Sequence, residues 1–111
     1  MDEEQLRAAS KTTDKTDRVA VARLALRAVP IAARPPYAVA PMQGAEPIIL
    51  EQVLCDLLPH ESGDLSAKWA DNRRYAQDGM SYAQYMGWLK TVDRAGVRMC
   101  VVTDKGRLTG E

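Results

Sequence analysis

The sequence predicts a mainly α fold, with four to five short helices and a small C-terminal β-hairpin. Apolar residues recur at helical spacing in several stretches, and five of the six prolines lie between residues 30 and 47, where they separate the helical stretches. After residue 96 the pattern changes to the alternation that is typical of a strand. With 111 residues, the chain has room for one modest core.

Three parts are expected along the chain. They are an N-terminal helical segment (1–29), a proline-rich connector (30–46) and a helical core module that carries the C-terminal hairpin (47–111). The formal net charge is zero, although residues 35–61 contain four acidic side chains and no lysine or arginine. The stretches on either side are only slightly basic, which disfavours a protein that depends on many phosphate contacts with nucleic acid.

In the N-terminal segment, helices are expected over residues 1–9 and 15–29. The second is apolar nearly all round, with one stripe through Arg23 and Arg27, and Pro30 is expected to end it. A helix of this kind must be covered by something. Packing within its own domain is the favoured explanation, and a dimer or partner face is the alternative.

The proline-rich connector is expected to be extended and stiff. Its Pro-Pro-Tyr run at 35–37 resembles proline-rich ligand motifs, but it lacks the spacer of PPxY and has no PxxP partner. A rigid connector is therefore favoured over a docking peptide.

After the connector, a helix over residues 48–58 is expected. Pro47 suits the first position of this helix and Pro59 ends it. Its broad apolar stripe predicts the central helix of the core, and three polar side chains are left for solvent: Glu51, Gln52 and Asp56.

The clearest pattern predicts two helices joined by a tight turn, which makes the second half helix-turn-helix-like. The first helix covers residues 65–77 and exits at the Asp-Gly pair 78–79. The second covers residues 80–95, because Ser81 and Gln84 have the spacing of a capping box and apolar residues follow at helical spacing.

Gly87 falls inside this second helix, where a glycine costs about 1 kcal/mol relative to alanine. Close packing against a neighbouring helix is the favoured reason, and a partner that approaches the backbone is the alternative. A strand over residues 97–102, a turn over 103–106 and a short return strand over 107–109 then form the expected hairpin.

The layout from residue 65 to residue 108 is similar to a winged helix-turn-helix. The Thr-Asp-Lys-Gly-Arg run at 103–107 also resembles a run near the end of the wing in many small bacterial regulators, although no long basic wing precedes it. The resemblance implies a DNA-binding transcriptional regulator. Its DNA-facing residues are then Gln84, Lys90, Thr91, Arg94 and Arg98.

Side chains for catalysis or metal binding are few. His60 is the sole histidine, and Cys55 and Cys100 are the only cysteines, which disfavours a closed zinc site. Cys55 lies in the expected core helix and His60 in a loop, so a buried thiol and a loop histidine are expected rather than a catalytic pair. We therefore expect no enzyme, no catalytic residue, no metal ion and no cofactor.

The hypothesis that these observations favour is a small non-enzymatic protein that binds a protein partner and modulates, most simply inhibits, its activity. The length of 111 residues and the Ala- and Arg-rich composition are similar to those of accessory proteins of phages and other mobile elements. The candidate contact residues are Arg23 and Arg27 on the N-terminal helix and two rings expected to be exposed, Tyr75 and Trp88.

The partner hypothesis includes a possible homodimer through the N-terminal helix, and DNA is a partner only under the helix-turn-helix alternative. The acidic start is wrong for a signal peptide, and the apolar run 19–29 is interrupted by arginines and too short to cross a bilayer. A cytoplasmic protein without membrane contact is expected.

Overall fold

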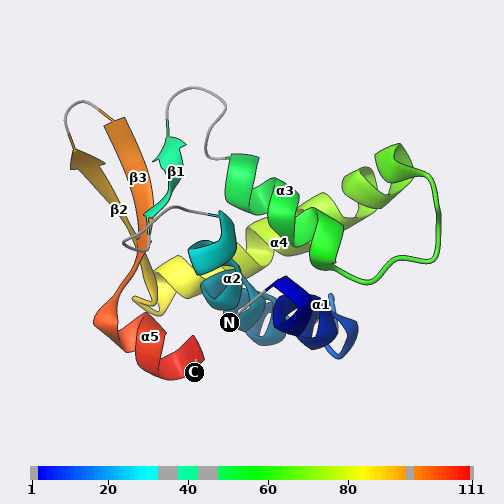
Figure 1. Cartoon of the computed structure of the whole chain (residues 1–111), viewed down its shortest axis with the longest axis horizontal. Coiled ribbons are helices and arrows are strands. Elements are labelled where there is room, and N and C mark those ends of the chain that lie inside the picture. The colour runs from blue at the N-terminus through cyan, green and yellow to red at the C-terminus, as the bar shows by residue number, and fades with distance from the viewer. Residues whose placement is uncertain (1–2, 33–37, 43–47, 95–96, 111) are drawn as a thin grey trace.

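The computed structural model describes residues 3–32, 38–42, 48–94 and 97–110 (Figure 1). Over these residues the chain is mainly helical, with five helices and an antiparallel hairpin near the C-terminus, which confirms the predicted fold class. The helices are α1 (Glu3–Lys11), α2 (Arg18–Ala32), α3 (Ile48–Leu57), α4 (Leu65–Tyr85) and α5 (Asp104–Gly110), and the strands are β1 (Ala38–Met42), β2 (Leu89–Arg94) and β3 (Val97–Val102).

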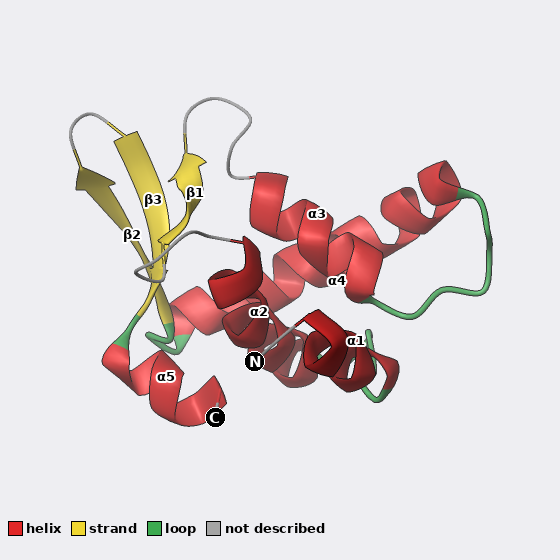
Figure 2. Ribbon diagram, in the orientation of Figure 1, coloured by secondary structure: helices red, strands yellow, loops and turns green. Residues whose placement is uncertain are grey.

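The sheet stands at one end of the molecule, helices α1 to α4 pack together beside it, and α5 lies near its base (Figure 2). Strand β3 is central, with β1 and β2 antiparallel on either side. The pairing of β2 with β3 is regular, from Leu89 opposite Val102 to Arg94 opposite Val97. Strand β1 lies in the stretch expected to be a connector, and a register shift interrupts its pairing with β3.

Helix α2 is the centre of the core. It packs against α1, α3, α4, α5 and two strands, β1 and β3, so its apolar surface is covered within the chain, as the favoured explanation requires. It begins after Asp17, whose carboxylate accepts the Val19 backbone N–H at 2.9 Å, and it continues past Pro30, which was expected to end it. Its buried side chains are Val21, Ala22, Leu24, Ala25, Leu26, Ala28 and Val29.

Helix α4 is a single helix of 21 residues, so the turn expected at residues 78–79 is wrong. Gly79 is buried in the middle of α4, where the helix crosses α2. A Cβ atom on Gly79 would lie 2.3 Å from Cγ1 of Val21 and 3.1 Å from the backbone nitrogen of Ala22. The glycine is there because the two backbones approach closely, and the helix-turn-helix arrangement expected for this half is not formed.

Helix α4 ends at Tyr85, and Gly87, two residues later, has a φ of 76°. The Trp88 N–H donates to the Ala83 carbonyl at 2.8 Å, and the Gly87 N–H donates to the Gln84 carbonyl at 3.0 Å. This pair of bonds is the Schellman motif, which needs a left-handed residue after the last turn. The helix expected over 80–95 is therefore wrong: its first residues finish α4 and residues 89–94 form β2.

The run at 103–107 begins a helix and not a hairpin turn. The Thr103 N–H donates to the Trp88 carbonyl at 2.9 Å, and Thr103 Oγ1 accepts the Gly106 N–H at 3.1 Å, so Thr103 caps α5. A Cβ on Gly106 would lie 2.2 Å from the Trp88 carbonyl oxygen. The return strand expected over 107–109 is also wrong, and the tip of the observed hairpin, residues 95–96, lies outside the described residues.

Helix α3 has the bounds predicted from the sequence to within one residue, and Pro47 lies outside the described residues. One side chain differs from expectation, since Glu51 is only 8% exposed. Its carboxylate accepts a hydrogen bond from Arg73 Nε at 2.9 Å and another from Gln77 Nε2 at 3.3 Å, both on α4. The ion pair and the amide together stabilise the buried charge.

Candidate functional site

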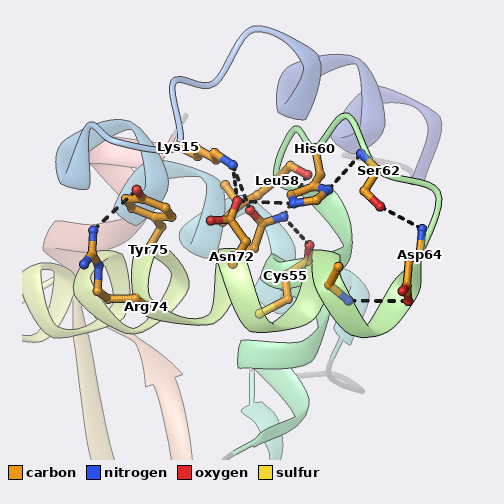
Figure 3. A network of polar contacts seen from close by, with 11 residues as sticks. Lys15, Cys55, Leu58, His60, Ser62, Asp64, Asn72, Arg74 and Tyr75 are labelled. Carbon is orange, nitrogen blue, oxygen red and sulfur yellow. Dashed lines mark hydrogen bonds and ion pairs between the residues drawn. The ribbon is translucent and has the colours of Figure 1, made fainter.

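A network of polar contacts lies where two loops meet the first half of α4 (Figure 3). One loop joins α1 to α2, and the other joins α3 to α4. Between them is an open pocket of about 500 Å³. It is lined by Lys15, Pro59, His60, Glu61, Ser62 and Asp71.

Asp71 on α4 joins the two loops. Its Oδ2 atom accepts a hydrogen bond from Lys15 Nζ at 2.5 Å and lies 3.3 Å from His60 Nε2. The hydrogen bond from Lys15 lowers the pKa of Asp71 below its usual value, and the nearby charges of Lys15, His60 and Arg74 act in the same direction. Asp71 is therefore a carboxylate at neutral pH.

His60 uses both of its ring nitrogens. Nδ1 accepts the Ser62 backbone N–H at 3.0 Å, so in the neutral ring the proton sits on Nε2, which faces Asp71. The lone pair that a general base needs is therefore occupied by a backbone donor. In this geometry the imidazole connects the α3–α4 loop to α4.

Asn72 lies beneath the cluster and is fully buried. Its Nδ2 donates to the carbonyls of Cys55 and Leu58, at 3.1 and 3.3 Å, which have no further turn of α3 to bind (Figure 3). The Cys55 side chain is buried as well. Burial, followed by the charges of Glu51 and Asp56, raises the pKa of the Cys55 thiol to about 11, so this thiol is protonated at neutral pH.

The α3–α4 loop is held by side chains at every second residue. His60 Nδ1 accepts the Ser62 N–H, Ser62 Oγ accepts the Asp64 N–H at 3.1 Å, and Asp64 Oδ1 accepts the Ser66 N–H at 2.9 Å. The last of these bonds caps α4. We call the three acceptors His60, Ser62 and Asp64 the relay.

The residues predicted to contact a protein partner have different surroundings. Arg23 is exposed and Arg27 half-buried on α2, and Tyr75 is half-buried between Lys15 and Arg74. Trp88 is only 6% exposed, so the expectation that its ring is exposed is wrong. The ring is in edge-to-face contact with Tyr82, with centroids 5.6 Å apart.

The residues predicted to face DNA do not lie on one helix. Gln84 is in the last turn of α4 and exposed, whereas Lys90 and Thr91 are exposed on β2. Arg94 belongs to β2 and Arg98 to β3, where they occupy neighbouring positions near the end of the hairpin. The recognition helix that the resemblance implies is therefore absent from the described part of the chain.

Several residues of the observed sites were missed by the sequence analysis. Lys15 and Asp71 meet across 56 positions, and no local pattern signals that contact. The relay could have been predicted from the sequence, because serine and aspartate side chains often accept the backbone N–H two residues later. Tyr85 and Leu108 are 86% and 78% exposed, and neither was among the predicted contact residues.

No protein family, no curated protein and no solved structure matches the chain. Within the described ranges, no group of three or more histidine, cysteine, aspartate or glutamate side chains is placed to hold a metal ion. None of the helices in those ranges is long and apolar enough to cross a membrane.

Proposed function

We propose that the protein is a non-enzymatic binding protein that docks on a protein partner and modulates its activity. The observation that carries the proposal is the exposure of two large apolar side chains, Tyr85 and Leu108, on elements that meet at Trp88. We call this pair the apolar end. Large, exposed apolar and aromatic groups on a rigid support are the usual anchors of protein interfaces.

The backbone under the apolar end is hydrogen-bonded and closely packed. Tyr85 ends α4, and the Schellman motif that follows leads directly to Trp88. The Trp88 carbonyl accepts the Thr103 N–H, and Gly106 of α5 packs on the same carbonyl. Leu108 is in the following turn of α5. Because both anchors stand on ordered backbone, little conformational entropy is lost when a partner covers them.

Two exposed lysines lie within five residues of the apolar end in the sequence. Lys90 is exposed at the start of β2, and Lys105 is exposed in the first turn of α5. Such groups suit the polar rim of an interface, where they influence partner choice and association rate more than affinity. On α2, Arg23 and Arg27 remain candidates for a second contact, whereas the apolar surface of this helix is already covered.

The chemistry of the polar cluster also supports binding over catalysis. The His60 ring is bound on both nitrogens, and Asp71 is shared between His60 and Lys15. The Cys55 thiol is buried and has a raised pKa. In this arrangement none of these groups offers an activated nucleophile or a free base to a substrate.

The experiment is a pull-down from cell lysate with the full chain as bait, with and without nuclease. A bait with Tyr85→Ser and Leu108→Ser removes both anchors, and Leu65→Ser serves as the matched control. Leu65 is 72% exposed but lies at the other end of α4. We expect one stoichiometric protein that survives nuclease, is retained by the control bait and is lost with the double variant.

The captured protein is then assayed for its own activity with increasing amounts of wild-type chain, and a saturable change is expected. Equal capture by the wild-type and double-variant baits would contradict the role of the apolar end. Recovery of nucleic acid, or of partners that disappear after nuclease treatment, would contradict the protein-binding proposal and favour DNA binding. In that case a steep dependence of binding on salt concentration would follow.

A further inference from the structure

The relay of the α3–α4 loop begins at a side chain whose acceptor can be removed by a proton. Histidine is the one side chain whose ordinary pKa, about 6.5, lies in the physiological range. Serine and aspartate side chains in general have no such property near neutral pH. Of the three hydrogen bonds of the relay, the first is therefore the one whose acceptor can be removed by a proton near neutral pH.

The geometry shows what a second proton on the ring would meet. The Ser62 N–H points at His60 Nδ1 from 3.0 Å, so a proton on Nδ1 would place two donors against each other (Figure 3). On the other side of the ring, Nε2 faces the Asp71 carboxylate at 3.3 Å, and a positive ring strengthens that contact. Protonation thus weakens one contact of the ring and strengthens the other.

We propose that His60 is a pH-sensitive latch: protonation of its ring releases the Ser62 N–H and loosens the α3–α4 loop, while the ring stays on Asp71. The inference is independent of the proposed function, because it uses no residue of the apolar end. The loop lines the 500 Å³ pocket, so the shape of the pocket changes with the state of the latch.

Charged groups reach the ring from each element around it. Lys15, on the α1–α2 loop, shares Asp71 Oδ2 with the ring and opposes its positive charge. Asp71, on α4, favours the positive ring, and its own pKa is lowered, so it remains charged throughout a histidine titration. Glu61, on the same loop as His60, lines the pocket with the ring and adds a second negative charge.

Contacts on both sides of the loosened loop do not involve the His60 ring and are unchanged when it is protonated. Asn72 still binds the carbonyls of Cys55 and Leu58 at the end of α3, and Lys68 Nζ still donates to the Asp56 carbonyl. Asp64 still caps α4. The response is therefore confined to residues 59–63 and does not unfold α3 or α4.

The latch can be tested by NMR on the full chain, because His60 is the sole histidine and its ring signals are unambiguous. Ring nitrogen shifts and the Ser62 amide are followed from about pH 8 to about pH 5.5, where histidines titrate and most carboxylates do not. At high pH we expect the tautomer with the proton on Nε2. As the ring titrates, the Ser62 amide should shift with the same midpoint.

Hydrogen exchange of the Ser62 amide, corrected for the intrinsic effect of pH, should become roughly fivefold faster when this single bond is lost. The Ser66 and Ala67 amides, which Asp64 caps, serve as internal controls and should keep their protection. A neutral ring with its proton on Nδ1 would overturn the latch. A Ser62 amide that does not follow the ring would also overturn it.

Two variants complete the experiment. His60→Asn keeps a side-chain acceptor for the N–H two residues later but does not titrate, so Ser62 should remain protected at every pH. His60→Ala removes the acceptor, so Ser62 should exchange rapidly at every pH. If His60→Asn kept the wild-type pH response, the response would come from other groups and the latch would be wrong.

Discussion

The two halves of α4 are held in different ways. The first half is fixed by polar contacts to two loops and to α3, through Asp71, Asn72 and Arg73. The second half is fixed by close packing, at Gly79 against α2 and at Ala83 within the core. One helix therefore depends on charge and solvent at one end and on close packing at the other.

The largest expected effect comes from added volume in the second half. Gly79→Val should lower the free energy of unfolding by about 3 kcal/mol, because the new side chain meets Val21 and the α2 backbone and forces the helices apart. Urea denaturation measures the change. The matched control is Gly63→Val, since a Cβ at Gly63 meets nothing within 4 Å. Similar stabilities for the two variants would show that α2 and α4 do not cross as described.

The next effect comes from the first half, through Asn72. Asn72→Leu removes the donor for two carbonyls and places an apolar group beside them, which should cost about 2 kcal/mol of unfolding free energy. Asp78→Asn, an exposed change on the same helix, should have almost no effect in the same denaturation experiment. A neutral result for Asn72→Leu would mean that packing dominates both halves of α4.

A smaller effect is expected where α4 ends. Gly87→Ala should cost about 1 kcal/mol, because a left-handed backbone is unfavourable for a residue with a Cβ, although space around the position is open. Gly87→Asn should cost less, since asparagine tolerates this conformation. Thermal unfolding of the two variants beside the wild type gives the order. Equal melting temperatures for alanine and glycine would contradict the Schellman end.

The smallest effect is the acid response of the first half. The folded pKa of Asp71 is lowered by Lys15, so its contribution to stability is present above the unfolded value of about 3.9 and is lost as pH falls through the folded pKa. Asp71→Asn should therefore make the loss of stability on acidification shallower, below about pH 5. Thermal melts over this range test it. An unchanged acid profile in the variant would place the acid response in other carboxylates.

Asp14 in the α1–α2 loop belongs to the same acid range, because hydrogen bonds from the Thr16 hydroxyl and backbone lower its pKa. Comparison of Asp14→Asn with Asp71→Asn separates the two loops. At neutral pH both variants should be less stable than the wild type. This difference in stability should disappear at low pH.

The elements that the sequence predicted well are those with local signals. Helix α3 was predicted from its apolar stripe and from Pro59. Helix α2 is apolar nearly all round, which correctly predicted that other elements cover it. The fold class follows from the same patterns. These patterns depend on residues close together in the sequence, so they predict an element without knowledge of the tertiary structure.

The errors in the second half come from glycines whose roles are set by neighbours. Gly79 follows an aspartate and looks like a turn, but it is required by the approach of α2. Gly87 looks like a helix interior because Ser81 and Gln84 suggest a new helix start, yet it is the left-handed residue that ends α4. Thr103, which was predicted to lie in a hairpin turn, caps α5 instead.

The candidate site was less predictable than the fold. The exposure predicted for Trp88 was wrong because it depends on where α4 stops. Lys15 and Asp71 carry no signal in the sequence, since their contact exists only once α1 and α2 have packed beside α4. Local chemistry identified His60 as a loop residue but not the ring's two partners.

The crossing at Gly79 divides α4 into two arms of unequal length. With a rise of about 1.5 Å per residue, the Leu65 end lies about 21 Å from the crossing and the Tyr85 end about 9 Å. A small tilt about the crossing therefore moves the loop end more than twice as far as the apolar end, in the opposite direction.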